Sequence, residues 1–311
     1  MGRMVWKNGL FLPESQAVQS VYDGASLYGD CVFEMMRTFN KVPFRLDLHL
    51  DRLIESCRAT YMPLNYTFRQ LKMAHEDLLA RNRHEFSPDD EIRTMVNVSR
   101  GVFPLYSAIT NCEPWVMMTA FPLWWVLRGV SEAFTKGVHA ITPSQRQIPA
   151  QFLDPKVKNR SRLHYRLAEL EVKRADPNAW ALLLDDQGYI AEGSGSNFFI
   201  VQGSRLITPE PRNCLRGISR NYTLSLAREL GIDYRERNLE IYDAINADEA
   251  FFTGTPFSIM PVSRFNFQQI GRGTPSSFDI TTRLTKAWCE RVGVDWIEQV
   301  RKWDAERPVT N

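Results

Sequence analysis

Two lysines near the middle of the chain could take part in covalent chemistry. Lys158 lies in the segment Pro155–Arg160, at the end of a short extended stretch and before a helix that we expect to begin near Ser161. A lysine in a partly buried place loses its proton more easily and can act as a nucleophile or a base. Lys156 would share a strand face with Lys158, so periodicity alone does not choose between them. The alternative is that Lys158 is an ordinary solvated lysine.

A single acid lies within a run of small residues further along the chain. Glu192 and Asn197 belong to the stretch Gly188–Asn197, which reads GYIAEGSGSN and separates two apolar strands. Small neighbours permit the close approach of a flat ligand, and a carboxylate there could pair with a protonated ring nitrogen. Taken alone, the same run could be only a glycine-rich turn.

Two later segments are suited to bind an anion. The stretch Gly217–Ser219 stands at the start of a predicted helix, where backbone N–H groups and the helix dipole attract phosphate. The alternative there is an ordinary serine N-cap. The stretch Phe252–Pro256 ends a strand in hydroxyls and a glycine, so Gly254 and Thr255 form a second candidate cradle for phosphate or carboxylate.

A phosphorylated aldehyde cofactor needs these features together. It requires a lysine for the imine, a carboxylate for the ring nitrogen and anion-binding backbone at a helix start. Each signal is weak by itself, but the chain contains all three in one order.

Composition narrows the class of protein. The 311 residues are 44% apolar, which is enough for a large core in two domains or one large one. Basic residues number 38 against 36 acidic ones, so the chain lacks the basic field of nucleic-acid binders. No apolar run is long enough to cross a bilayer, and no signal peptide is visible. Five scattered cysteines and dispersed histidines predict reduced thiols, a cytoplasmic location and no metal site.

The hydrophobic pattern predicts an α+β chain with mostly local hairpins and without the βαβ alternation of a dinucleotide-binding domain. We expect a hairpin over 5–11 with Asn8-Gly9 inside it, strands at 32–39, 42–46, 93–99, 115–121, 180–184, 198–201 and 205–208, a turn at 185–188, and helices at 48–56, 68–83, 219–230 and from 280 to beyond 292. A further amphipathic helix carries Leu163, Leu167, Leu170 and Val172, and the tail 301–311 is expected to fray. A composition change between residues 121 and 135 predicts a linker there.

In this order the segments resemble the class IV aminotransferases, from Val5 to about Val262. Leu27–Phe39 is similar to the family's YGxxVFExxR segment, and His49–Leu53 is similar to its HxxRL helix. The resemblance implies fold type IV, the D-amino acid aminotransferase-like fold, with a small N-terminal α/β domain (1–125) and a larger C-terminal domain (126–311). Pyridoxal 5'-phosphate (PLP) would lie between them. It also implies a homodimer in which the loop 104–108 acts in trans.

The resemblance implies roles for individual residues. Lys158 would form the imine with PLP and later move the substrate's α-proton, and Glu192 would hold the pyridine nitrogen. PLP would also be bound by Arg52, Asn197, Gly217, Ile218, Ser219, Gly254 and Thr255, and the substrate by Tyr28, Phe33, Arg37, Arg93 and Pro256. The implied reaction is the ping-pong transfer of an amino group from a hydrophobic L-amino acid to a 2-keto acid such as 2-oxoglutarate.

Within the family the pattern favours the branched-chain members. Tyr28, Phe33 and Arg37 match them, as does Arg93, at a position where an arginine helps to recognise an acidic co-substrate. D-amino acid enzymes have an arginine and a histidine where this chain has Leu105 and Ser107. The alternatives are an (R)-amine or D-amino acid transaminase, an aminodeoxychorismate lyase-like PLP enzyme, and a binding protein without activity that keeps the fold.

The chain also departs from the branched-chain pattern. Leu163 replaces the tyrosine found five residues after the lysine, Met35 replaces a glycine, and Thr255–Ser258 replaces a pair of alanines. These changes indicate a reshaped pocket. A polar cluster follows the lysine and could line the pocket or merely form the start of a helix; it consists of Arg160, Arg162, His164 and Tyr165. Core packing explains Trp124 and Trp125 better than a role in the pocket does.

Overall fold

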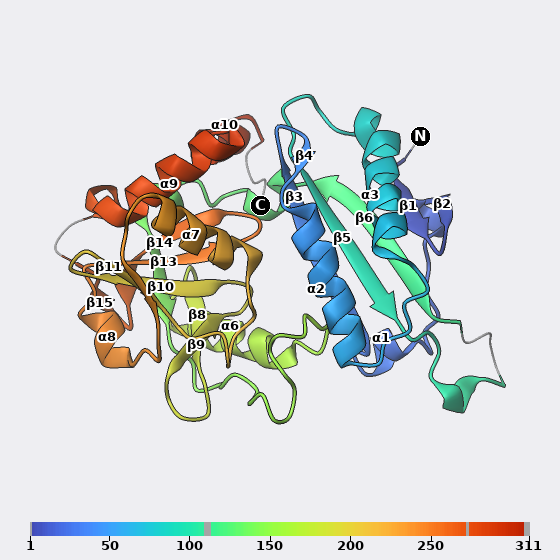
Figure 1. Cartoon of the computed structure of the whole chain (residues 1–311), viewed down its shortest axis with the longest axis horizontal. Helices are drawn as coiled ribbons and strands as arrows, with labels where there is room; N and C mark the ends of the chain where they lie inside the picture. The colour runs from blue at the N-terminus through green and yellow to red at the C-terminus, as the bar shows by residue number, and fades with distance from the viewer. Residues whose placement is uncertain (1, 109–112, 272–273, 308–311) are drawn as a thin grey trace. The chain divides into compact units, whose positions relative to one another are not determined.

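The computed structural model describes residues 2–108, 113–271 and 274–307, and its contacts divide the chain into two units (Figure 1). The first unit consists of Met1–Trp125 and Val157–Arg162, and the second of Val126–Lys156 and Leu163–Asn311. The sequence-based division assigned residues 157–162 to the C-terminal domain, whereas in the structure they pack with the first unit. Val157, for example, belongs to the core of that unit.

The first unit is built on a six-stranded antiparallel sheet. Its strand order is β2 (Leu10–Pro13), β1 (Met4–Lys7), β6 (Trp115–Pro122), β5 (Ile92–Ser99), β3 (Cys31–Phe39) and β4 (Val42–Pro43). The predicted β1–β2 hairpin is confirmed, and Asn8 and Gly9 both have the positive φ that a two-residue hairpin turn requires. The strand predicted over 42–46 is wrong beyond Pro43, because Arg45 adopts a left-handed conformation and a helix begins at Leu46.

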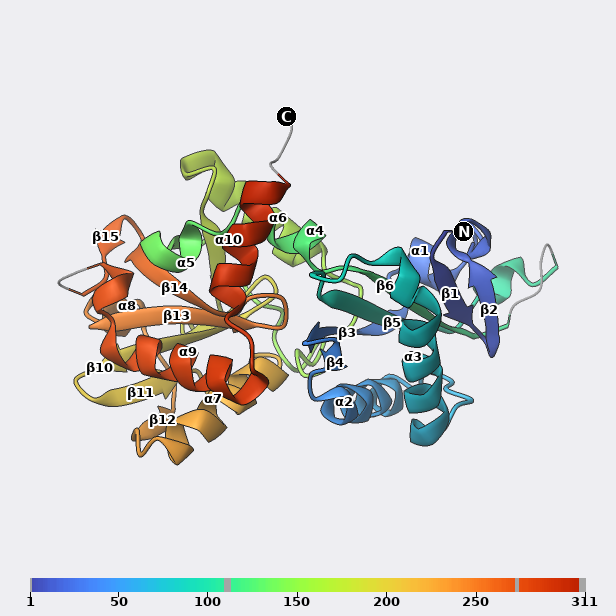
Figure 2. The same ribbon diagram turned by 90° about the horizontal axis from the view of Figure 1, so that it is seen from above.

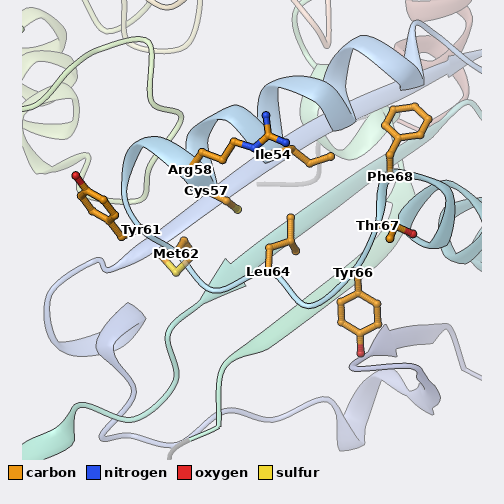
Figure 3. A pocket seen from close by; sticks show the side chains of 9 residues that line it. All are labelled: Ile54, Cys57, Arg58, Tyr61, Met62, Leu64, Tyr66, Thr67 and Phe68. Atoms are coloured by element: carbon orange, nitrogen blue, oxygen red, sulfur yellow. The ribbon is translucent and has the colours of Figure 1, made fainter.

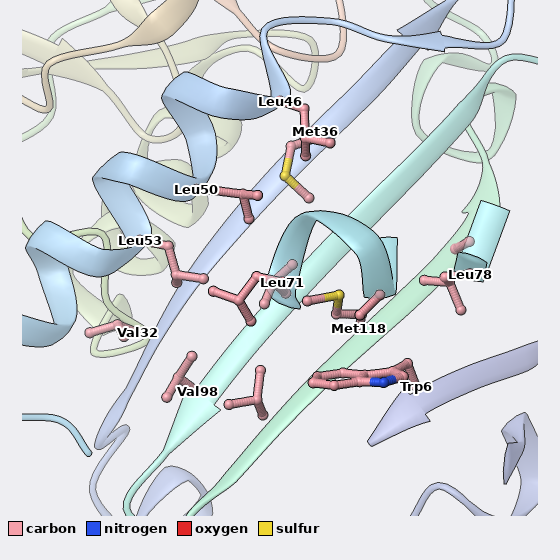
Figure 4. Packing of buried hydrophobic residues seen from close by; sticks show 14 of the residues in the cluster. Trp6, Val32, Met36, Leu46, Leu50, Leu53, Leu71, Leu78, Val98 and Met118 are labelled. Atoms are coloured by element: carbon pink, nitrogen blue, oxygen red, sulfur yellow. The ribbon is translucent and has the colours of Figure 1, made fainter. Parts of the chain in front are cut away.

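Two helices cover one face of this sheet. They are α2 (Leu46–Ala59) and α3 (Phe68–Asn82), and α3 begins with a capping box formed by Thr67 and Gln70. Figure 4 shows the apolar side chains of both helices packed against β3, β5 and β6. The shorter elements of the unit are η1 (Glu14–Gln16), α1 (Gly24–Leu27), η2 (Arg83–Glu85) and η3 (Pro104–Tyr106). Removing this apolar surface from water is the main force that holds the helices in place.

The second unit is built on a mixed nine-stranded sheet. Its order is β12 (Tyr234–Glu236), β11 (Arg205–Thr208), β10 (Asn197–Gln202), β13 (Glu249–Gly254), β14 (Ser258–Phe265), β7 (Val138–Ile141), β8 (Trp180–Leu184) and β9 (Ile190–Gly193), and β15 (Gln268–Gln269) pairs with β14. The predicted α+β mixture with local hairpins is confirmed. Three pairings, β11–β12, β7–β8 and β7–β14, are parallel and join segments distant in sequence.

The second unit also contains several helices. They are α5 (Ala133–Lys136), α6 (Leu163–Ala175), α7 (Ile218–Glu229), α8 (Ile241–Ile245), α9 (Asp279–Val292) and α10 (Trp296–Glu306), with η4 (Pro275–Ser277) before α9; α4 (Trp124–Leu127) spans the boundary between the units. Figures 1 and 2 show α7 and α9 side by side. The Trp288 ring of α9 joins them, because it contacts Tyr222 of α7 and Trp296 of α10.

The buried face of α6 differs from the prediction. The helix begins at Leu163 rather than near Ser161. Its leucines Leu163, Leu167 and Leu170 are exposed, with 71%, 46% and 44% of their surface accessible. Instead Tyr165, Ala168 and Val172 pack into a core with Ile141, Ala181 and Leu183. The apolar face predicted for this helix is therefore rotated from the face that is buried. The spacing of apolar residues did not show that Tyr165 is buried.

Two smaller predictions are corrected. Trp124 is only partly buried and Trp125 is 46% exposed, so neither belongs to the core. The tail does not fray from residue 301, since α10 continues to Glu306 and buries Trp303. Cys112 lies outside the described residues; the other four cysteines are free. Within the described ranges, no helix combines the length and apolar character that are needed to span a membrane.

His75 makes the stability of the first unit depend on pH. Its side chain on α3 is fully buried, and Nε2 lies 2.8 Å from Thr94 Oγ1. Burial, reinforced by the neighbouring His49, lowers the pKa of His75 to about 4. In the unfolded chain the histidine takes up its proton near pH 6.5, so the unfolded state binds more protons between these values.

We therefore expect the free energy of unfolding to fall by about 2 kcal/mol between pH 7 and pH 5 on account of His75 alone. Urea unfolding of the wild type and His75→Gln at both pH values measures this. The free energy of unfolding of His75→Gln should fall less between pH 7 and pH 5 than that of the wild type. In His84→Gln, a change at an exposed histidine, it should fall as much as in the wild type. Equal slopes in all three proteins would contradict the assignment.

Candidate active site

Lys158 is held on the edge of β3. The Phe33 N–H donates to the Lys158 carbonyl and the Arg160 N–H donates to the Cys31 carbonyl, both at 2.9 Å. Asn159 forms a bridge with Val32 between them. The Lys158 N–H also donates to Ser56 Oγ, at 3.3 Å. These bonds fix the backbone of the lysine, and its Nζ lies 4.9 Å from the centroid of the Phe33 ring.

Lys156 has a different environment. It belongs to the second unit, and its Nζ forms an ion pair with Asp154 at 2.8 Å, with about a third of the side chain exposed. Lys156 is thus engaged by a neighbouring carboxylate, whereas the Lys158 Nζ lies against the Phe33 ring. The structure therefore gives different surroundings to two lysines that periodicity left equivalent.

Arg52 lies on α2 beside a buried carboxylate. Its Nε and Nη2 donate to Glu34 Oε1 and Oε2 at 2.6 and 2.9 Å, and His49 Nδ1 lies 2.7 Å from Glu34 Oε2. Burial disfavours the charged form of Glu34, but the Arg52 charge and the His49 contact outweigh it and hold the pKa of Glu34 well below its usual range. Glu34 therefore stays ionised and fixes the orientation of the Arg52 guanidinium.

The four substrate residues predicted in the first unit have different environments. Tyr28 is 60% exposed and its ring contacts Phe103. Phe33, Arg37 and Arg93 are buried on β3 and β5. The Arg37 guanidinium stacks on the Phe39 ring, 3.7 Å from its centroid, and Nε donates to the Thr38 carbonyl.

The polar cluster that follows Lys158 is divided between the units. Arg160 and Arg162 belong to the first unit and approach the Phe33 ring, at 3.7 and 5.9 Å from its centroid. His164 and Tyr165 belong to the second unit. They contact Gln147, with His164 Nε2 at 3.1 Å from its amide oxygen and the Tyr165 hydroxyl at 2.6 Å from its amide nitrogen.

Glu192 is the centre of a buried hydrogen-bond network in the second unit. Its side chain leaves β9 and is 4% exposed. Oε1 accepts from the Tyr165 hydroxyl and from Gln147 Nε2, both at 2.6 Å. Oε2 accepts from the Leu215 N–H at 3.0 Å, and Asn197 Nδ2 lies 3.5 Å away. Donors on two sides fix the direction of this buried carboxylate.

Gln147 was not predicted from the sequence. It lies 45 residues before Glu192 in an irregular segment, and no motif links the two. The burial of Tyr165 within an otherwise leucine-rich helix is the one local signal, because a buried tyrosine hydroxyl needs a polar partner.

The second unit also contains groups suited to hold a phosphate. The helix α7 begins at Ile218 after Gly217, without a side-chain cap, so the first backbone N–H groups lack intrahelical partners by geometry. The serine N-cap alternative is thereby wrong. A Cβ at position 217 would lie 2.0 Å from Asn197 Oδ1, so a side chain there would displace the Asn197 amide.

Two hydroxyls near Thr255 are buried at the β13–β14 turn. Thr253 Oγ1 and Ser258 Oγ have no hydrogen-bond partner within the described part of the chain. An unsatisfied buried hydroxyl is costly, and a bound ligand with oxygen acceptors could satisfy such a group. PLP requires a lysine, an anion-binding arginine, a carboxylate and an uncapped helix start. The chain supplies each of these groups, so its residues fit this cofactor.

A cavity in the first unit is separate from these residues. It has a volume of about 610 Å³ and shares none of the candidate site residues (Figure 3). Its lining comes from the end of α2 and the segment before α3: Ile54, Cys57, Arg58, Tyr61, Met62, Leu64, Tyr66, Thr67 and Phe68. Among the residues that the structure describes, no group of three or more His, Cys, Asp or Glu side chains could hold a metal ion.

Comparison with known proteins gives consistent results. The family model described as "Amino-transferase class IV" matches residues 31–265. A protein of Methanocaldococcus jannaschii, provisionally named as a branched-chain-amino-acid aminotransferase, is 35% identical over 278 residues, which is 87% of this chain and 92% of that protein. The branched-chain-amino-acid aminotransferase of Pseudomonas aeruginosa is 29% identical and covers 93% of this chain and 92% of its own.

Solved structures agree. The branched-chain amino acid aminotransferase of Thermobaculum terrenum, solved in its PLP-form, superposes with a TM-score of 0.81 at 27% identity, and 97% of each chain is covered. The Escherichia coli branched-chain enzyme gives 0.82 at 29% identity, over 93% of this chain and 94% of its own. The predicted fold type and family are therefore confirmed, and this chain belongs to the class IV aminotransferases.

Proposed function

We propose that this chain is a PLP-dependent transaminase that moves an amino group from a hydrophobic, branched-chain-like L-amino acid to a 2-keto acid such as 2-oxoglutarate. The observation that carries the proposal is the pairing of a class IV aminotransferase fold with Lys158 fixed on β3. The names of the similar proteins support the branched-chain donor.

PLP, when bound, supplies an aldehyde that takes up an amine and a ring that stabilises negative charge beside it. Lys158 would hold the cofactor through Nζ. Once the substrate amine has replaced it there, Nζ would be free to remove the substrate's α-proton and to deliver it to the carbon on the other side of the amine nitrogen. The amino group stays in the site when the first keto acid leaves, and the second keto acid binds only then, so the reaction is ping-pong.

The remaining residues bind and orient the cofactor. Glu192 keeps a proton on the ring nitrogen, and Asn197 supports its strand by donating to the Leu215 carbonyl at 2.8 Å. The phosphate is held by Arg52, by the backbone at Gly217, Ile218 and Ser219, and by Gly254 and Thr255. Tyr28, Phe33, Arg37, Arg93 and Pro256 contact the substrate, with Arg93 serving the acidic acceptor.

We further propose a homodimer in which the loop 104–108 contributes to the other subunit's site. Most of this loop is exposed in the single chain, Leu105 included, so it is available to contact another subunit. Light scattering on a sizing column distinguishes a dimer from a monomer. The four described free cysteines support a reducing compartment such as the cytoplasm.

The substrate assignment is tested with a panel of amino donors. Purified protein with PLP should lose its visible absorbance band on addition of L-leucine, L-isoleucine or L-valine, and should regain it with 2-oxoglutarate. D-amino acids and (R)-amines should act far more slowly. Loss of the visible band only with D-amino acids or (R)-amines would contradict the assignment to L-amino acids. Release of pyruvate without an amino acceptor would indicate a lyase.

The cofactor lysine is tested by a matched pair of variants. Lys158→Ala should reduce turnover by about 1,000-fold or more, because it removes both the attachment point and the base. Lys156→Ala should stay within about threefold of the wild type, since its ammonium is paired with Asp154. Borohydride reduction followed by peptide mapping should label Lys158. A label on Lys156 instead would overturn the assignment.

The Glu192 network is tested by two nearly isosteric changes. Glu192→Gln removes the charge that holds the ring proton and should lower kcat by about 100-fold. Tyr165→Phe removes only one donor to Oε1, so we expect a smaller loss and a shift in the pH at which the visible band changes. Spectral pH titration measures the shift. A Tyr165→Phe spectrum identical to the wild type at every pH would show that the network does not act on the cofactor.

A further inference from the structure

The face of the first sheet opposite α2 and α3 is cationic. The register pairs Phe33 with Asn97 and Met35 with Met95, and these residues alternate with the Val32, Val96 and Val98 side chains that face the helices. Arg93 lies on this second face, four residues before Asn97 along β5. The bridge to β3 adds Lys158 and Arg160 to the same face, because both approach the Phe33 ring.

Neutral groups hold Arg160 firmly. Its Nε and Nη2 donate to Asn97 Oδ1 at 3.0 and 2.8 Å, and the guanidinium stacks on Phe33 at 3.7 Å from the ring centroid. Nη2 also lies 2.7 Å from the Met95 sulfur. An amide, an aromatic ring and a thioether orient a guanidinium without cancelling its charge.

Arg93 beside it is buried and poorly satisfied. Its side chain is 8% exposed, and its Nε and Nη1 have no hydrogen-bond partner among the described residues. Nη2 lies 3.2 Å from the sulfur of Met35, a weak acceptor. Burial, and then the like charge of Arg160, lower the pKa of Arg93 to about 10, so it remains protonated at neutral pH.

The nearby carboxylates are engaged elsewhere. Asp30 pairs with Arg100, Glu34 with Arg52, and Glu91 accepts from Thr38 and the Asn40 N–H. Within the described ranges, no carboxylate forms an ion pair with Arg93 or Arg160. A buried and a partly buried guanidinium with no counter-ion leave a strong local preference for an anion.

We infer that Arg160, positioned by Asn97 and Phe33, joins Arg93 in a two-arginine subsite for the second carboxylate of a dicarboxylic substrate. Lys158 extends over the same ring, so the subsite is on the face where the reacting amine is held. The inference rests on the proposed function and adds a specificity-determining residue to it. The chain should therefore prefer dicarboxylic keto acids over monocarboxylic ones.

The test is the binding of unreactive acids to the PLP-loaded protein, measured by calorimetry. Glutarate carries the second carboxylate, and 4-methylpentanoate has an isopropyl group in its place. Arg160→Met should weaken glutarate binding about tenfold or more and change 4-methylpentanoate binding less than about twofold. Arg160→Lys keeps the positive charge but cannot donate through two nitrogens to Asn97, so glutarate affinity should fall to a value between those of the wild type and Arg160→Met. Arg160→Gln serves if the Met variant does not fold.

Arg81→Met is the matched control. Its guanidinium also stacks on a phenylalanine, Phe11, at 4.2 Å, but it extends from α3 on the other side of the sheet. This variant should bind both acids as the wild type does. The KM for 2-oxoglutarate should rise about tenfold in Arg160→Met with little change for 4-methyl-2-oxopentanoate.

The outcomes separate the inference from the proposed function. If the wild type transaminates L-leucine but glutarate binding does not depend on Arg160, or both acids weaken equally, the subsite is refuted and the function stands. If no amino donor reacts but glutarate binding depends on Arg160, the anion subsite is supported and the transaminase proposal fails.

Discussion

The hydrogen bonds between residues 158–160 and β3 are the constraint on which the candidate chemistry depends. A backbone bonded along a strand edge has its side-chain directions set by the pleat. Lys158 and Arg160 therefore share one side, and Asn159 occupies the other as it bridges Val32. The residues before 157 and after 162 belong to the other unit. The hydrogen bonds of residues 158–160 to β3 are therefore what places Lys158 on the first sheet.

Much of the local fold could be predicted from the sequence, since it depends on short-range chemistry. Asn8-Gly9 specifies a hairpin, and the strands β3, β5 and β6 follow from runs of branched and apolar residues. The parallel pairings of β7 could not be predicted, because they join segments with no signal in common. The buried face of α6 was predicted wrongly for a related reason. Its exposed leucines have the spacing of a core stripe. The face that is buried includes Tyr165, whose hydroxyl donates to Glu192 outside the helix.

The candidate site was only partly predictable for a similar reason. Motifs identify residues that are close in sequence to a distinctive pattern, such as Lys158 or Glu192. They do not identify the side chains that orient them. Gln147 beside Glu192 and Asn97 beside Arg160 lie in stretches with no functional signature. Ser258 appears as an ordinary turn residue, and only its burial and its unsatisfied hydroxyl distinguish it. Orientation comes from tertiary contacts, which a single sequence does not encode in its spacing.

The first unit holds its arginines in two ways, and the difference has chemical consequences. Arg52 is bound through two nitrogens by an ionised Glu34, so the pair is nearly neutral and the carboxylate fixes the direction of the guanidinium. Arg160 and Arg93 have neutral neighbours, so their full charges persist in a largely buried setting. The Phe33 ring supplies apolar surface and at the same time supports the Arg160 guanidinium. One face of the sheet can then offer apolar contact area to an aliphatic side chain and positive charge to a carboxylate. A transaminase needs both if a hydrophobic donor and an acidic acceptor are to use the same lysine in turn.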